Sequence, residues 1–243
     1  MTRPDHLVVV VGTGTEVGKT WVAARLLERW REEGITVAAR KPAQSFDPEE
    51  LSPTDSEVLA RASGEQPDTV CPAQRSYPLA VAPPMAARRL GRAQLRLADV
   101  VAELHWPSPP VGVGLVETAG GVRSPQAEDA DAVDLADALG PDHVLLVADA
   151  GLGTINAVRL AVDALQRAAL PSVVVLNRYD RDDRLHRDNV DWLRARDGVE
   201  VETADPPGLR RLAARLGPYG AGDQTPALLS TTVAPTFERP EKS

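Results

Sequence analysis

A glycine-rich segment near the start of the chain has the spacing of a phosphate-binding loop. The sequence VGTGTEVGKT follows the apolar run LVVVV and ends in Gly18, Lys19 and Thr20. In such loops, successive backbone N–H groups and the N-terminus of the following helix face the phosphates. The lysine reaches the terminal phosphates and the threonine hydroxyl binds Mg²⁺. The segment therefore predicts a nucleoside triphosphate site.

Two features separate this loop from that of an ordinary nucleotide switch. Five residues, not four, lie between Gly12 and Gly18, and one of them is the acidic Glu16. In a pure switch, a carboxylate at this point would only repel the phosphates. Glu16 therefore indicates that another ligand binds beside the nucleotide.

Two acidic residues are candidates for holding the metal that phosphoryl transfer requires. Glu117 ends an apolar run and is followed by TAGG, a position that suits a metal-facing carboxylate. Asp55, in SPTDSEV, stands at an expected helix start. Taken alone, the sequence favours a helix cap or a first-turn acid at Asp55, with metal binding as the alternative.

Lysine is rare in this chain, which makes each lysine informative. Only three of the 27 basic residues are lysines: Lys19, Lys41 and Lys242. Lysine is a compact, flexible point charge that the planar guanidinium of arginine does not imitate. Lys41, in RKPAQS, follows the second apolar run. We therefore expect Lys41 to act on phosphate together with Lys19.

Apolar runs that alternate with amphipathic stretches define the elements that must position these residues. Near-continuous apolar strands separated by helices predict an α/β fold: a parallel sheet of the P-loop NTPase type with helices on both faces, in a single domain. Ligands of such sheets bind at the carboxyl ends of the strands. The expected strands are 7–11, 35–39, 112–117, 143–149, 172–177 and, more weakly, 199–203, and the expected helices are 21–33, 130–139, 155–169 and 185–196.

The rest of the chain predicts the limits of the domain, and its composition excludes some classes of function. Residues 46–110 are expected to be helical with proline-bounded turns, the domain to span 1–219, and the Pro- and Ser/Thr-rich segment 220–243 to be a flexible tail. The net charge of −8 and a pI of about 5.1 argue against a general nucleic-acid or membrane surface. A single cysteine and no membrane-length apolar run suit a cytoplasmic protein.

Together these motifs resemble the dethiobiotin synthetases, ATP-dependent enzymes that close the ureido ring in biotin synthesis. The resemblance runs from about Leu7 to Asn177, and the family loop G-T-x-T-E-V-G-K-T is matched throughout, including the extra residue. The other family elements are matched by Lys41, Pro42 and Ser45 for K-P-x-x-S, Asp55 for the metal-binding aspartate, ETAGG from Glu117 for E-G-A-G-G, LGTIN from Leu152 for L-G-x-I-N, and Asn177 for the base-contacting asparagine.

The resemblance implies a role for each matched residue. It implies catalysis by Thr15, Glu16, Lys19 and Lys41, and metal binding by Thr20, Asp55 and Glu117. It implies nucleotide binding by Glu16, Val17, Gly18, Lys19, Thr20, Trp21, Asp55, Glu117, Thr118, Ala119, Gly120, Asn177 and Arg178. It implies substrate binding by Thr15, Lys41, Ser45, Gly153, Thr154, Ile155 and Asn156.

The resemblance also implies the reaction, the cofactor and the assembly. One amine of 7,8-diaminononanoate captures CO₂ as a carbamate, which attacks the γ-phosphate of ATP in the presence of Mg²⁺; the second amine then closes the ring and expels phosphate. The turn 151–156 serves the active site of a neighbouring subunit, so a homodimer is expected. We hypothesise that Glu16 offsets local positive charge or orients Thr15 and the incoming amine.

Three positions depart from the family pattern. Thr118 replaces a glycine, which would strain the backbone if that position needs a positive φ. Pro83, Pro84 and Met85 stand in place of Ser-Pro-His, and VETADPPGLRR does not show the segment that encloses the purine, so the nucleobase stays open.

Two other nucleotide-binding classes fit the motifs less well than this family. The partition-type ATPases need a lysine where the chain has Gly14, and the cobyrinate-type amide synthases need a glutaminase domain for which no chain remains. A catalytically diverged homologue that acts as a binding module or switch is the remaining alternative.

Overall fold

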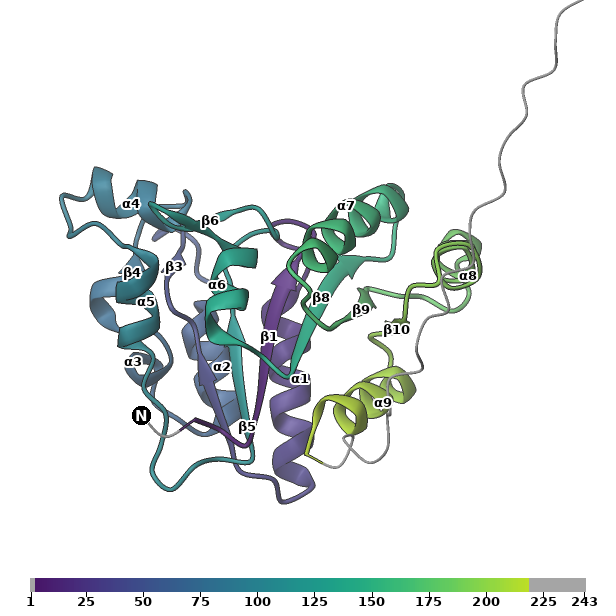
Figure 1. The fold of residues 1–243 in the computed structure, drawn as a ribbon, viewed down its shortest axis with the longest axis horizontal. Coiled ribbons are helices and arrows are strands. Elements are labelled where there is room, and N and C mark those ends of the chain that lie inside the picture. Colours follow the sequence, from purple (N-terminus) through teal and green to yellow (C-terminus); the bar gives the residue numbers. More distant parts are fainter. Residues whose placement is uncertain (1–2, 219–243) are drawn as a thin grey trace, which may run out of the picture.

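The fold is built on one six-stranded sheet in which every neighbouring pair of strands is parallel. The computed structural model describes residues 3–218, and its strands follow the order β10-β9-β8-β1-β5-β2 (Figure 1). This confirms the predicted parallel α/β sheet, with strand bounds close to those expected. The strands of this sheet are β1 (His6–Gly12), β2 (Val37–Arg40), β5 (Val113–Glu117), β8 (His143–Asp149), β9 (Ser172–Asn177) and β10 (Val201–Thr203).

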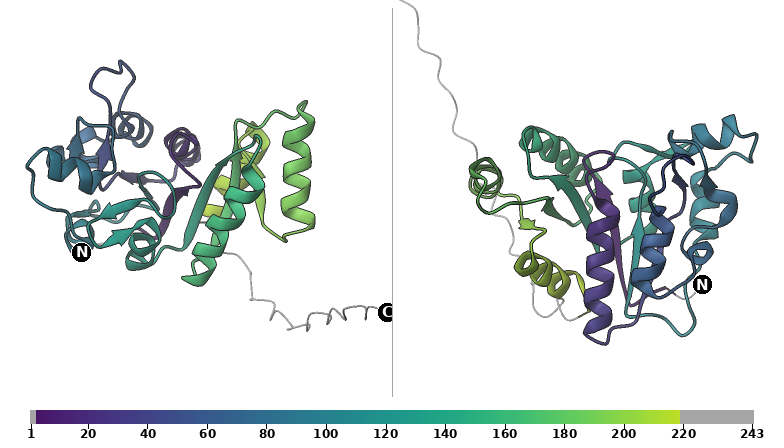
Figure 2. Two further views of the ribbon diagram at one scale, coloured as in Figure 1. Left: turned by 90° about the horizontal axis from the view of Figure 1, so that it is seen from above. Right: turned by 180° about the vertical axis from the view of Figure 1, so that it is seen from behind.

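Side chains of the central strand alternate between two hydrophobic clusters, one on each face of the sheet. Val8 and Val10 of β1 belong to the cluster that includes α1 (Lys19–Glu32) and α2 (Asp55–Ser63). Val9 and Val11 belong to the cluster under α6 (Ala132–Leu139), α7 (Thr154–Arg167) and α8 (Arg184–Ala195). Figure 2 shows α1 and α2 in front of the strands when the molecule is seen from behind. Because both faces are covered, β1 can be apolar at every position from Leu7 to Val11.

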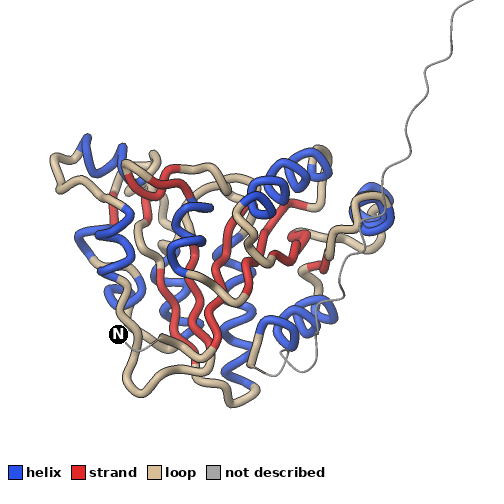
Figure 3. Tube along the Cα trace, viewed as in Figure 1, coloured by secondary structure: helices blue, strands red, loops and turns tan. Residues whose placement is uncertain are grey.

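The long excursion between β2 and β5 has short helices as its main regular elements, joined by turns and loops, and lies beside the β2 edge of the sheet. It contains α2, α3 (Pro67–Val70), α4 (Pro83–Arg89) and α5 (Leu97–Glu103), with a single 3₁₀ turn at Ala73–Arg75. The sequence did not predict the short parallel pair β3 (Gln44–Ser45) and β4 (Ser76–Tyr77), nor the antiparallel pair β6 (Pro125–Ala127) and β7 (Ala130–Asp131). Figure 3 shows helices surrounding the strands on this side.

Helix α9 (Pro206–Leu216) is a helix that the sequence analysis did not identify. Asp205 caps the helix by accepting the N–H of Gly208, and the two prolines fill its first positions. Proline is compatible with these positions because the first N–H groups of a helix have no intrahelical partner. Leu212, Ala213 and Leu216 then close the cluster around α1.

The expected flexible tail, residues 220–243, lies outside the described residues. Between residues 3 and 218, no helix combines the length and apolar character needed to cross a bilayer.

Candidate active site

The phosphate-binding loop joins β1 to α1 and is held in a compact turn. Its backbone turns through positive φ at Glu16 (60°) and Gly18 (89°). A Cβ at Gly12 would lie 2.9 Å from the carbonyl oxygen of Gly14 and 3.1 Å from that of Gly120, so only glycine fits there. Helix α1 begins at Lys19 without a side-chain cap, which leaves its first N–H groups available to an anion. The loop is therefore a preformed cradle for phosphate.

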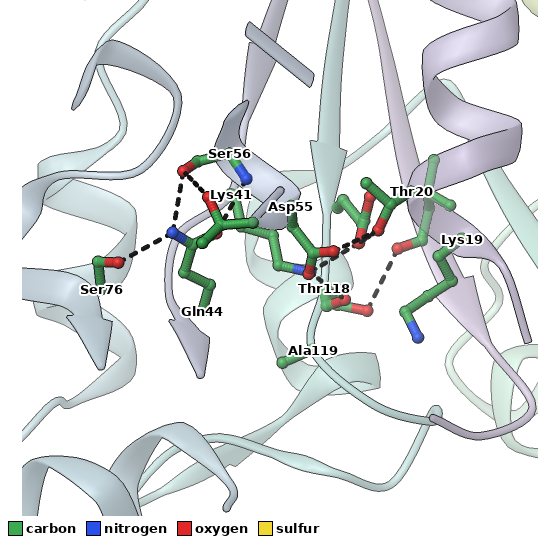
Figure 4. A network of polar contacts seen from close by, with 12 residues as sticks. Lys19, Thr20, Lys41, Gln44, Asp55, Ser56, Ser76, Thr118 and Ala119 are labelled. Atoms are coloured by element: carbon green, nitrogen blue, oxygen red, sulfur yellow. Dashed lines mark hydrogen bonds and ion pairs between the residues drawn. The ribbon is translucent and has the colours of Figure 1, made fainter. Parts of the chain in front are cut away.

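Four predicted residues from four separate segments meet beside this loop; Figure 4 labels three of them, Thr20, Lys41 and Asp55. The Lys41 ammonium lies 2.6 Å from Glu117 Oε1 and 2.7 Å from Asp55 Oδ2. The hydroxyl of Thr20, at the start of α1, lies 2.7 Å from Asp55 Oδ1 and 2.9 Å from Glu117 Oε1. We call these four residues the lysine–carboxylate cluster. Each comes from the carboxyl end of a strand or from the first turn of a helix.

Burial and charge set the ionisation of this cluster. Burial alone would lower the pKa of Lys41, but the two carboxylates raise it above its ordinary value, so the side chain stays an ammonium. Burial likewise works against ionised Asp55, yet Lys41 holds the pKa of Asp55 below its usual range. Glu117 is fully buried, and this burial raises its pKa. Lys41 is thus a permanent cation between two acids of unequal strength.

Lys19 lies outside this ion network. Its ammonium donates to the carbonyl of Gly14 at 3.1 Å and has no carboxylate partner among the described residues. Burial, and after it the charge of Lys41, lower the pKa of Lys19 to about 8. A phosphate bound in the loop would give the Lys19 ammonium the anionic partner that it lacks among the described residues.

The cluster has the donor set and spacing of a Mg²⁺ site. Adjacent oxygens around octahedral Mg²⁺ lie about 2.9 Å apart, given metal–oxygen distances of about 2.0–2.1 Å. Thr20 Oγ1 lies at comparable distances from Asp55 Oδ1 and Glu117 Oε1. Glu117 Oε2 is buried and has no hydrogen-bond partner in residues 3–218. No group of three or more His, Cys, Asp or Glu side chains forms a metal site in that range, so phosphate and water oxygens would complete the shell.

On the opposite side of the loop, the ends of β8 and β9 hold its backbone. Asn177 Nδ2 donates to the carbonyl of Val17 at 3.0 Å. Arg178 donates to the carbonyl of Glu16 and to Asp149 Oδ2, each at 2.8 Å. Asn177 and Arg178, both predicted nucleotide contacts, therefore have a direct role in shaping the loop.

The turn 151–156 forms the N-terminus of α7. Gly153 precedes the helix with a φ of 91°, and no side chain caps the helix. The Thr154 hydroxyl is buried without a partner among the described residues, whereas Asn156 is exposed in the first turn and Ile155 packs partly against the core. An unpartnered hydroxyl at an uncapped helix N-terminus is suited to an anion. No hydrogen bond joins this turn to the lysine–carboxylate cluster within residues 3–218.

The other predicted residues lie around the loop with fewer contacts. Thr15, Glu16 and Trp21 are exposed. The Glu16 carboxylate makes no hydrogen bond or ion pair in the described part of the chain, so the structure offers no partner for its hypothesised charge-balancing role. The buried Ser45 hydroxyl also has no hydrogen-bond partner among the described residues.

Thr118, which replaces a glycine of the family pattern, fits its place after Glu117 without backbone strain. Thr118 is not among the residues with positive φ, and its N–H and hydroxyl both donate to Val10 O, at 3.0 and 3.2 Å. The strain considered for a β-branched residue here is therefore absent. Ala119 follows it, and Gly120 takes the positive φ of 67°.

Sequence reasoning missed three polar residues that support this site. Gln126 is buried and bonds both the N–H and the carbonyl of Ala119. Asn189 is buried and donates to the carbonyls of Ala150 and Gly151, and Asp149 accepts the N–H of Gly151. Asparagine is as scarce as lysine in this chain, so the third asparagine carried a usable signal.

Comparisons with known proteins agree with this geometry. Residues 6–206 match the family described as an AAA domain. The chain is 40% identical over 222 residues to the ATP-dependent dethiobiotin synthetase BioD of Rhodococcus jostii, covering 90% of this chain and 93% of that protein. The chain belongs to the ATP-dependent dethiobiotin synthetase family. A second dethiobiotin synthetase, from Anaeromyxobacter dehalogenans, is 42% identical over 177 residues, which is 72% of this chain and 77% of that protein.

Among solved structures, chloroplast FtsY from Physcomitrella patens matches with a TM-score of 0.48 and 17% identity, over 86% of this chain and 61% of that one. The two dethiobiotin synthetase relatives confirm, at the level of the family, the resemblance drawn from the motifs.

Proposed function

We propose that this protein is an ATP-dependent dethiobiotin synthetase, a ligase that forms carbon–nitrogen bonds in biotin biosynthesis. Its substrates are 7,8-diaminononanoate, CO₂ and ATP, and Mg²⁺ is its metal. The observation that carries the proposal is the lysine–carboxylate cluster beside a preformed phosphate loop. The names of the two relatives support the same reaction.

The reaction needs one nucleophile to be built before phosphoryl transfer. One amine nitrogen attacks CO₂ and forms a carbamate; a carbamate oxygen attacks the γ-phosphorus and releases ADP. The second amine then attacks the carbamoyl carbon, closing the ureido ring and releasing phosphate. Because both substrates of the middle step are anionic, positive charge must gather around the transferred phosphoryl group.

The residues of this chain divide that task by position. The N–H groups of the loop and of the start of α1 hold the phosphates, and Lys19 neutralises the terminal ones. Thr20, Asp55 and Glu117 would hold Mg²⁺, which supplies charge neutralisation on the β- and γ-phosphates when bound. Lys41 binds the oxygens between which the phosphoryl group moves, and Thr15 and Ser45 orient the carbamate end of the diamine.

The far end of the diamine is a carboxylate, and the turn 151–156 is its proposed receiver. The uncapped start of α7 and the unpartnered Thr154 hydroxyl support this assignment. We assign the turn to the site of a second copy of the chain, in a homodimer. Leu152 is 91% exposed in the turn and Leu160 is 63% exposed on α7, as expected for a surface that another subunit covers.

The alternative, a diverged homologue that acts as a nucleotide switch, is not favoured. Relatives that match most of the chain are named dethiobiotin synthetases, whereas a switch would only need to keep the nucleotide-binding residues.

The decisive experiment incubates the full chain with 7,8-diaminononanoate, bicarbonate and Mg-ATP and detects dethiobiotin by mass spectrometry. ATP hydrolysis should require both the diamine and bicarbonate. Hydrolysis that proceeds at the same rate without either of them, and yields no dethiobiotin, would establish the switch instead.

A further inference from the structure

The Lys41 ammonium sits on the same carboxyl groups that are assigned to the metal. It contacts Glu117 Oε1 and Asp55 Oδ2, while Thr20 contacts that same Glu117 oxygen and the other oxygen of Asp55 (Figure 4). Glu117 Oε1 is therefore shared between the lysine and the hydroxyl. A metal ion that used this oxygen would compete with the lysine for it.

Burial explains why a cation must be present in this place. The side chains of Lys41 and Glu117 are 2% and 1% exposed. Without a counter-ion the two carboxylates would repel each other, and Glu117, unlike the 40% exposed Asp55, would lack the hydration that offsets its charge. The ammonium therefore stabilises the arrangement of the two acids.

The same contacts are a poor position from which to act on phosphate. Two short ion pairs bind the Lys41 ammonium, and within residues 3–218 its other hydrogen-bond partner is the carbonyl of Thr118 at 3.4 Å. A second cation on these carboxyl groups would weaken both ion pairs by competition and would repel the ammonium. Because lysine has a long, flexible stem, its charge can swing away while its backbone stays fixed.

We propose that Lys41 is the resident counter-ion of Asp55 and Glu117, and that it leaves these oxygens for the reacting phosphate and carbamate only when the metal takes them. This inference rests on the proposed function, since it uses the same metal ligands. It adds a second role for Lys41 and a sequence of events: the catalytic ammonium is released when the metal and the nucleotide arrive.

Metal binding to the nucleotide-free protein tests this directly, without turnover. Mn²⁺ is titrated into the full chain and the EPR signal of free Mn²⁺ reports binding, for wild type, Lys41→Met and Lys19→Met. Both variants remove one positive charge near the site, but only Lys41 contacts the carboxylates. We expect Mn²⁺ to bind about tenfold more tightly or better to Lys41→Met, and within about threefold of wild type to Lys19→Met.

Two results would overturn the proposal. Equal Mn²⁺ affinity in wild type and Lys41→Met would show that the lysine does not compete with the metal. An equal gain in both variants would show only a general effect of charge. Lys41→Gln, which keeps hydrogen-bond donors between the acids, gives the same comparison if Lys41→Met does not fold.

The shift of the unfolding temperature on adding Mn²⁺ is an independent test. The unfolding temperature of Lys41→Gln should rise more with added Mn²⁺ than that of wild type, because the tighter metal stabilises the folded state more. If wild type makes dethiobiotin but Mn²⁺ binds equally well to wild type and to the Lys41 variants, only the proposed displacement of Lys41 by the metal is wrong. If wild type makes none, the proposed function fails whatever the metal titration shows.

Discussion

Arg178 donates a hydrogen bond to the main-chain carbonyl of Glu16 at 2.8 Å and so joins two residues that both have positive φ, 55° and 60°. The other arm of the same guanidinium pairs with Asp149. Non-glycine residues in this region of backbone space carry a strain of about 1–3 kcal/mol that the surroundings must offset. The backbone at Glu16, the non-glycine residue of the loop with positive φ, is therefore held from the adjoining strand ends.

Replacing Arg178 should loosen the loop without removing any reacting group. We expect Arg178→Ala to raise the KM for ATP about tenfold and to change kcat less, since the strained loop must then be ordered by the nucleotide itself. Arg211→Ala is the matched control, because Arg211 also makes an exposed ion pair, with Glu202, away from the loop. If both variants show the same KM for ATP, the contact with Glu16 has no role in binding.

Lys41 should not be replaceable by arginine. Its side chain is almost fully enclosed between two carboxylates, where a larger, planar guanidinium cannot take the same place. We expect Lys41→Arg to lower kcat by about a hundredfold, the loss typical of one electrostatic stabiliser, while Lys19→Ala weakens ATP binding much more than Lys41→Arg does. Steady-state kinetics with equilibrium ATP binding separates the two effects. Near-normal turnover in Lys41→Arg would refute the need for a point charge.

The two carboxylates should set the magnesium requirement. Asp55→Asn and Glu117→Gln each remove a charged oxygen ligand, so the Mg²⁺ concentration for half-maximal rate should rise about tenfold or more. Glu57→Gln is the control for Asp55, since Glu57 lies in the same helical turn and forms the capping box with Thr54 instead. An unchanged metal dependence in Asp55→Asn would leave Asp55 only the role of a first-turn acid.

Mixing two inactive variants tests the shared site. Lys41→Ala removes the lysine, and Asn156→Asp places a negative charge in the exposed first turn of α7, where it would repel the diamine carboxylate. In a shared-site heterodimer, one site carries both lesions and the other carries none. Random exchange makes about half of the dimers mixed, so about a quarter of wild-type activity should return. Demonstrated exchange with no recovery would mean that each chain builds its site alone.

Cys71 provides a pH-dependent probe of folding. Burial raises the pKa of its thiol to about 12, so the native protein should not react with a thiol reagent at pH 8, whereas the unfolded chain should react fully. The folded thiol keeps its proton where the unfolded one loses it, so this group's contribution to stability falls as pH rises from about 8.5. Urea unfolding of Cys71→Ala should show a smaller loss of stability between pH 8 and 10. An identical loss in both proteins would exclude the thiol as the cause.

The sequence was sufficient for the large sheet because its strands are continuous β-branched runs, a pattern that parallel sheets impose. It was insufficient where an element is short or where contacts decide a role. Strands β3 and β4 have two residues each, too few to show a period. Helix α9 was not identified, although Asp205, a capping residue, stands directly before Pro206 and Pro207.

The site residues show the same contrast between what the local sequence reveals and what only the folded contacts reveal. The loop was recognisable because all its parts are local. Asp55 was not resolved from its local sequence, since it is both the first residue of α2 and a partner of Thr20 and Lys41. Asn189 sits in a strongly charged segment, and only the packing of α8 against the turn after β8 reveals its buried position.

The strand order has a consequence for how the chain matures during synthesis. Strand β1 is flanked by β5 and β8, both of which are more than a hundred residues further along the chain. A ribosome making this protein therefore releases the phosphate loop long before the strands that flank β1 exist. Such long-range pairing slows folding, and until β5 and β8 arrive the apolar β1 has no native sheet partner. Nucleotide-binding competence should therefore be acquired late, only after the chain beyond Asn177 has emerged.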